Sequence, residues 1–172
     1  SQSGRTPDVV EYVARARAAG ALTIAVTNDP VSELAAAAET AIPLAAEPEL
    51  AVAATKTYVN TLAVLALLAG HLAGRGPEVS NGISRAAEQL AEVLPSLERA
   101  AAGMALPFAY TGRMFVIGRG VEFATAREIA LKLLETCRIA AEPLTATDLA
   151  HGPVAALDPL FPVWAIASPD AT

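Results

Sequence analysis

Short apolar, β-branched runs alternate with segments of helical spacing along this chain, and that alternation restricts the fold more than any other feature. The runs at 21–28 (ALTIAVTN) and 41–45 (AIPLA) are typical of buried strands. The same kind of run returns at 113–120 (RMFVIGRG) and 161–168 (FPVWAIAS). Strands that alternate with helices predict an α/β protein with doubly wound parallel sheets.

Two such α/β units, joined by long helices, account for the 172 residues. We expect a first unit at 1–76, a connecting helix at 77–104 and a second unit at 105–172. A polar connector is expected at 74–82. The expected helices cover 6–19, 32–38, 51–72, 83–102 and 121–137. The strand-turn-helix that begins at Arg113 is what we would expect before Ser1, so both units are expected to be cut at the ends of the chain.

Composition excludes several classes of protein. Apolar residues make up 53% of the chain and charged residues 17%, so a sizeable core is expected. The net charge of −6 comes without a basic cluster, which argues against nucleic acid as a partner. The longest apolar run, from Leu62, is too short to cross a membrane. With no signal peptide, the expected location is cytoplasmic.

Metal and disulfide sites are not indicated by the sequence. Cys137 is the single cysteine, and we expect it to be a small core residue. His71 and His151 are far apart in sequence, and no carboxylate-rich spacing accompanies them. We therefore expect neither a metal nor a cofactor.

The first six residues, SQSGRT, combine hydroxyl side chains with a glycine directly before a helical segment. A loop between a parallel strand and a helix lies where open sheets bind ligands, and the helix end offers unpaired N–H groups. Ser1, Ser3 and Thr6 could then surround a phosphate. Alternatively, Ser3 or Thr6 simply caps the helix. The residues alone leave both interpretations open.

The segment EIALKLLE places Glu128, Lys132 and Glu135 on one face of one helix, at i, i+4 and i+7. One interpretation is a surface ladder of ion pairs, which is the commoner case. The other is a proton-transfer carboxylate held by a cation.

Two further stretches have both a structural and a functional interpretation. His151 precedes Gly-Pro in a loop, where an imidazole can exchange protons near neutral pH or serve a structural role. In ELAVAATKTYVNTL, at 49–62, Glu49 lies near the positive end of a helix. The functional alternative places the backbone around Val52 against a ligand.

Four motifs, SQSGRT, E-x-x-V-A-x-T-K, E-x-A-L-K-L-x-E and HGP, resemble in their order the SIS (sugar isomerase) domains. The similarity is greatest to the paired-SIS isomerase half of glucosamine-6-phosphate synthases (glutamine–fructose-6-phosphate aminotransferases). It implies two SIS-type, flavodoxin-like, three-layer units. It also implies that the substrate is a sugar phosphate.

The resemblance assigns roles to particular residues. Ser1, Gln2, Ser3 and Thr6 resemble a phosphate-binding loop, and Val52 resembles a backbone contact to the sugar. Glu135 resembles the carboxylate that moves a proton between C1 and C2, with Lys132 and Glu128 as its neighbours on the helix. His151 resembles the histidine that opens the sugar ring in the neighbouring subunit's site, which implies a homodimer.

The expected reaction is aldose–ketose isomerisation of a hexose or hexosamine 6-phosphate, coupled to amino transfer or deamination. One carboxylate can remove a proton from one carbon and return it to the next. The family's glutaminase half and its C-terminal Schiff-base lysine are not within these residues, which favours an isomerase or deaminase without its own glutaminase. The alternative is a non-catalytic phosphosugar sensor that regulates a partner.

Overall fold

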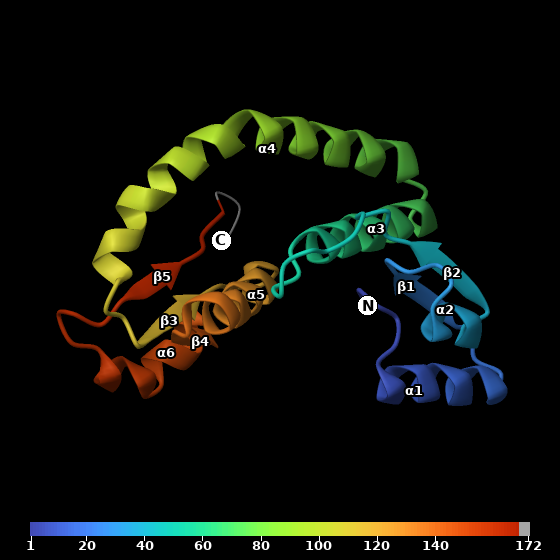
Figure 1. The fold of residues 1–172 in the computed structure, drawn as a ribbon, viewed down its shortest axis with the longest axis horizontal. Helices are drawn as coiled ribbons and strands as arrows, with labels where there is room; N and C mark the ends of the chain where they lie inside the picture. The colour runs from blue at the N-terminus through green and yellow to red at the C-terminus, as the bar shows by residue number, and fades with distance from the viewer. Residues whose placement is uncertain (169–172) are drawn as a thin grey trace. The chain divides into compact units, whose positions relative to one another are not determined.

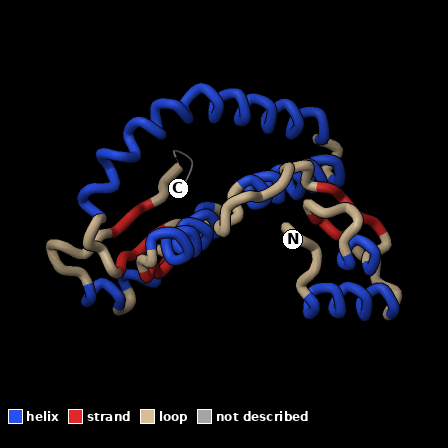
Figure 2. Tube along the Cα trace, in the orientation of Figure 1, coloured by secondary structure: helices blue, strands red, loops and turns tan. Residues whose placement is uncertain are grey.

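The computed structural model describes residues 1–168 and divides the chain into two compact units, Ser1–Val93 and Leu94–Thr172. Both are helix-rich α/β units with parallel sheets, as the alternation of segments predicts (Figures 1 and 2).

The first unit contains a two-stranded sheet (Figure 1). Its strands pair in parallel, with Ile24 opposite Thr40 and Thr27 opposite Pro43, which confirms the predicted parallel pairing. Its elements are α1 (Pro7–Ala18), β1 (Ile24–Thr27), α2 (Glu33–Ala37), β2 (Thr40–Pro43), α3 (Lys56–Leu72) and the first part of α4 (Gly76–Ala105).

The core of the first unit is built on β1. Ala25 of β1 packs with Leu34 and Ala38, and Val10 and Val13 of α1 lie against them. Ser32, the first residue of the helix predicted at 32–38, caps α2, and its hydroxyl accepts a hydrogen bond from the Ala35 N–H at 3.3 Å. These contacts hold α1 and α2 against the sheet, so that α1 begins close to the end of β1.

The second unit has a three-stranded parallel sheet in the order β4-β3-β5 (Figure 1). Met114 and Val116 of β3 are buried against Ala126 and Ala130 of α5, so α5 covers one face of this sheet. The elements after α4 are η1 (Leu106–Phe108), β3 (Arg113–Ile117), α5 (Glu122–Lys132), η2 (Leu133–Cys137), β4 (Ala140–Leu144), α6 (Ala146–Ala150), η3 (Pro153–Ala156) and β5 (Val163–Ala165).

Two predicted helix boundaries are wrong. Residues 74–82 were expected to form a connector, but α4 already begins at Gly76. Proline is favourable in the first turn of a helix, and Arg75 pairs with Glu78 there, with the Nε–Oε2 distance 2.9 Å. The helix expected from residue 51 begins instead at Lys56, and the residues before it form a loop.

Candidate functional site

The N-terminal loop (Ser1–Thr6) lies at the carboxyl end of β1, on the edge that β2 leaves free. The Ser1 amino group donates to the Val26 carbonyl at 2.7 Å, and the Asn28 N–H donates to the Ser1 carbonyl at 3.2 Å. These two bonds follow the pattern of a parallel ladder. The loop therefore lies beside the carboxyl end of β1 and leads directly into the amino end of α1.

The hydroxyl groups of this loop do not cap α1. Thr6 is the N-cap residue, but its side chain makes no capping hydrogen bond. Ser1 Oγ accepts from the Gly4 N–H at 3.1 Å, and Ser3 Oγ accepts from the Arg5 N–H at 3.4 Å. Each serine oxygen therefore acts as an acceptor within the loop, and its O–H proton remains available to an anion. The capping interpretation of Ser3 and Thr6 is wrong.

Gly4 fixes the shape of this loop. Its φ is +63°, in the left-handed region, and a Cβ at this position would overlap the buried side chain of Ser32 and approach Thr27 Oγ1 to 2.9 Å. The Gly4 carbonyl accepts from the Leu34 N–H at 2.9 Å. Only glycine fits both the φ and the space, so the turn exposes Ser1, Gln2 and Thr6 while Gly4 is buried.

A second segment of the first unit, the connecting loop (residues 44–55), carries Val52. The Val52 residue is 96% exposed. Glu49 fixes the end of the loop, because its Oε2 accepts from the Thr55 N–H, the Thr57 N–H and the Thr57 hydroxyl, each at 3.1 Å. These bonds, above all that from the Thr57 N–H, lower the pKa of Glu49. The predicted place of Glu49 at the positive end of the helix is confirmed.

Glu128, Lys132 and Glu135 form a single cluster in the second unit. Lys132 Nζ lies 3.3 Å from Glu128 Oε1 and 2.8 Å from Glu135 Oε2. The Lys132 side chain is 22% exposed and that of Glu135 32%, so the cluster is only partly screened by solvent. The hydrogen bond to Glu135 is the main cause that raises the pKa of Lys132. Lysine is thus held as a cation against both carboxylates.

Glu135 lies in a π-helical turn that the sequence did not predict. After Lys132, residues Leu133–Cys137 form η2, and Arg138, with φ of 58°, ends it. The Thr136 hydroxyl donates to the Lys132 carbonyl at 2.7 Å. Turns of this kind are rare and occur frequently at functional sites.

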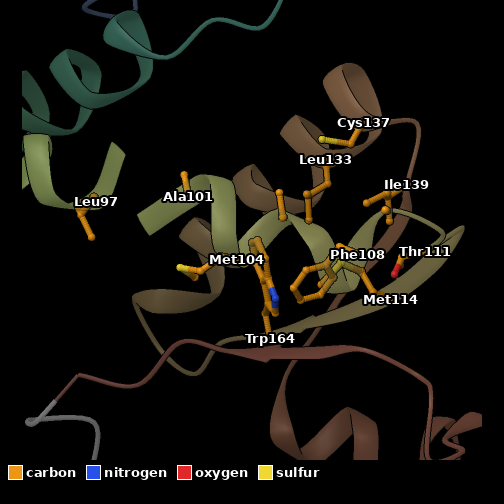
Figure 3. A pocket seen from close by; sticks show the side chains of 12 residues that line it. Leu97, Ala101, Met104, Phe108, Thr111, Met114, Leu133, Cys137, Ile139 and Trp164 are labelled. Carbon is orange, nitrogen blue, oxygen red and sulfur yellow. The ribbon is translucent and has the colours of Figure 1, made fainter. Parts of the chain in front are cut away.

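Cys137 was expected in the core, but it is exposed. The π turn places it at the wall of an apolar cavity of about 560 Å³ in the second unit, with Phe108, Met104 and Trp164 also on its walls (Figure 3). None of the described residues that line this cavity carries a charge. The cavity therefore suits apolar groups and offers no binding site for a phosphate.

His151 ends α6 in the second unit. Its backbone N–H contacts the Thr147 and Asp148 carbonyls at 3.2 Å, and the residue is exposed. The helix begins with a capping box in which Thr145 Oγ1 accepts from the Asp148 N–H at 3.0 Å. The Thr145 hydroxyl, and to a smaller extent His151, lower the pKa of Asp148. This short capped helix fixes the backbone of His151 and leaves its ring accessible.

Asn28 was not predicted as a site residue, although it is hydrogen-bonded to both the N-terminal loop and the connecting loop. The available signal was an asparagine directly after a buried parallel strand, where ligand-binding loops begin.

Neither a metal cluster nor a membrane span was found in the part of the chain that the structure describes. Within residues 1–168, no three His, Cys, Asp or Glu side chains gather to hold a metal ion. No helix among these residues has the length and apolar character to cross a bilayer.

Comparison with known proteins identifies the same family throughout. The family model described as SIS domain matches residues 1–70 and 108–172. The isomerizing glutamine–fructose-6-phosphate aminotransferase of Gloeobacter violaceus is 39% identical over 177 residues, covering 98% of this chain. The corresponding enzyme of Thermotoga maritima is 38% identical over 181 residues, covering 99% of this chain.

A solved structure supports the fold. The C-terminal domain of glucosamine-fructose-6-phosphate aminotransferase from Francisella tularensis superposes with a TM-score of 0.85 at 27% identity, over 99% of this chain. The chain spans 50% of that structure and 29% of each of the two curated relatives.

Proposed function

The chain belongs to the SIS domain family, and from that premise we propose that it binds and acts on a hexose or hexosamine 6-phosphate. The proposed reaction is an aldose–ketose isomerisation, coupled to amino transfer or deamination, of the fructose 6-phosphate and glucosamine 6-phosphate type. Both curated relatives described above are named glutamine–fructose-6-phosphate aminotransferases, and this supports the proposed substrate class. In this proposal the parallel sheets belong to two doubly wound SIS-type units.

The observation that carries the proposal is the Glu128–Lys132–Glu135 cluster. A carboxylate that moves a proton between neighbouring carbons must be ionised, oriented and able to reach its substrate. Glu135 Oε2 is oriented by Lys132 Nζ at 2.8 Å, and its side chain remains 32% exposed. Glu135 is therefore the proposed proton shuttle, Lys132 holds it in place, and Glu128 holds Lys132 from the preceding turn.

The N-terminal loop is the proposed phosphate site. Ser1, Ser3 and Thr6 offer hydroxyl protons, Gln2 offers an amide, and α1 offers the positive end of its dipole. Binding energy from the phosphate would position the reacting carbons. The Val52 backbone is the proposed contact to the sugar, and its exposure leaves it free for one.

His151 is the proposed acid and base of ring opening. An imidazole near neutral pH can donate to the ring oxygen and accept from the hydroxyl. We propose that the protein is a homodimer in which His151 acts in the partner subunit's site.

The test is to incubate the complete natural protein with glucosamine 6-phosphate in heavy water and to follow deuterium at C1 and C2 together with ammonia. Deuterium entry with ammonia release is expected of a deaminase, and entry without it of an isomerase. Binding without exchange would refute catalysis and favour a phosphosugar sensor. Absence of binding would refute the proposal as a whole.

A further inference from the structure

Asn28, the first residue after β1, is bonded to both loops that the proposed function uses. Its backbone N–H donates to the Ser1 carbonyl of the N-terminal loop at 3.2 Å. Its side-chain Nδ2 donates to the Glu47 carbonyl at 2.7 Å, and its Oδ1 accepts from the Ala46 N–H at 2.9 Å, both in the connecting loop. One residue at the end of a strand thus joins the N-terminal loop to the connecting loop.

The connecting loop needs support of this kind. Beyond β2 it has no helix or strand until Lys56, so its peptide groups need partners other than the regular bonds of a helix or sheet. Ala45 and Glu47 have φ of 51° and 54°, a region that residues with a Cβ rarely adopt. The two side-chain bonds of Asn28 bind the peptide groups that follow these residues, on the Ala46 N–H and the Glu47 carbonyl. A carboxamide can make both bonds because it is at once a donor and an acceptor.

Two further side chains hold the same loop, but they tie it to α3. Asn60 Nδ2 donates to the Leu44 carbonyl at 2.9 Å, and Lys56 Nζ donates to the Pro48 carbonyl at 2.8 Å. Of these three residues, only Asn28 also bonds to the N-terminal loop. Its loss would leave the connecting loop bonded to α3 and, through the Leu44 N–H, to the Thr27 carbonyl, but Ala46 and Glu47 would no longer be bonded to the residue that also holds the N-terminal loop.

We infer that Asn28 is a positioning residue that sets the spacing between the N-terminal loop and the connecting loop, so that a sugar phosphate is held at both of its ends. This inference rests on the proposed function. A ligand that touches both loops gains from their fixed spacing, since the ordering is already present before it binds. Inorganic phosphate, which needs the N-terminal loop alone, gains nothing from it.

This difference supplies the test. We would measure the dissociation constants of fructose 6-phosphate and of inorganic phosphate by calorimetry on the complete natural protein. Asn28→Ala removes both side-chain bonds and keeps the backbone bond to Ser1. We expect the dissociation constant of fructose 6-phosphate to rise about tenfold, and that of phosphate to change by less than about twofold.

Two more variants serve as controls. Asn81→Ala makes the same truncation at an exposed position of α4 and should leave both constants unchanged. Asn28→Asp keeps the size and the acceptor atom but loses the donor to Glu47. Its charge acts on both ligands, so the ratio of the two constants is the readout, and the ratio should rise. Amide exchange of Ala46 should become faster in both Asn28 variants.

The outcomes separate the two claims. If both dissociation constants rise equally in Asn28→Ala, Asn28 only supports the fold. If neither dissociation constant changes, Asn28 does not set the spacing of the loops. Both results overturn the inference and leave the proposed function standing. If the unaltered protein binds neither ligand, the proposed function fails and the inference fails with it.

Discussion

Gly4 gives the sharpest test of the N-terminal loop, because its substitution by alanine has two separable costs. An alanine held at φ of +63° is strained by about 1–2 kcal/mol. The new Cβ also overlaps Ser32 and approaches Thr27, both of which are buried, and overpacking of this kind costs about 1–3 kcal/mol. Gly4→Ala should therefore destabilise β1 and α2 by about 2–5 kcal/mol.

Gly20 provides the matched control. Its φ is +85°, but no atom lies within 4 Å of the position that a Cβ would take. Gly20→Ala should thus have the backbone cost alone, about 1–2 kcal/mol. The difference between the destabilisation of Gly4→Ala and that of Gly20→Ala is therefore the free-energy cost of the contact between the new Cβ and the side chains of Ser32 and Thr27.

Amide hydrogen exchange in the complete protein measures this difference at residues 23–38, which contain β1 and α2. Exchange through opening of this region should be roughly 5- to 150-fold faster in Gly4→Ala than in Gly20→Ala, the ratio that about 1–3 kcal/mol implies. Equal exchange in the two variants would refute the close packing of Gly4 on Ser32.

Three further predictions concern the site itself. Glu135→Gln should abolish deuterium exchange, because the amide retains the size of the carboxylate but not its basicity. The dissociation constant of the sugar phosphate should stay within about threefold of its original value. The control Glu128→Gln, which changes a residue that does not touch the reacting atoms, should retain measurable turnover. Full activity of Glu135→Gln would refute the shuttle role. Ser3→Ala should weaken binding of a phosphorylated sugar but not of its phosphate-free analogue, in a competition assay; equal losses would argue against a phosphate loop. Glu49 has a lowered pKa in the folded state, so its stabilising bonds to the start of α3 are fully present above its ordinary value of 4.5 and are lost as the pH falls below it. Glu49→Gln should flatten that acid-side loss of exchange protection in α3, whereas Glu39→Gln should leave it intact.

The parts of the fold that the sequence predicted are those set by neighbouring residues. The β-branched run at 21–28 predicted β1 and its parallel pairing, because a short apolar run bounded by turn residues is typical of a buried strand. The spacing of Glu128, Lys132 and Glu135 predicted a shared helix face, and two ion pairs with Lys132 lie there. Both predictions rest on local patterns; Glu135 pairs with Lys132 although it lies in the π turn, which the spacing did not predict.

The errors occurred where a local signal has two meanings. The residues GPEVSNG contain turn formers, but proline and glutamate also begin helices, and α4 uses them in that way. Cys137 was predicted to be a small core residue because an unpaired cysteine is usually buried. It lies at the end of the π turn Leu133–Cys137, where it is exposed at the wall of the apolar cavity. None of the residue types at Leu133–Cys137 indicates a π turn in advance.

The arrangement around Asn28 could not be predicted because each of its parts is ordinary alone. Asn28 and Glu47 are 19 residues apart, and nothing in the sequence pairs a side-chain amide with one particular carbonyl. Glycine would have indicated the left-handed backbone at Ala45 and Glu47, but neither residue is a glycine. Such strain persists only where surrounding contacts determine the conformation, and here those contacts come from Asn28, Lys56 and Asn60. The left-handed backbone of Ala45 and Glu47 therefore indicates that the connecting loop is held in one conformation. A loop that presents its backbone to a ligand needs such a fixed conformation.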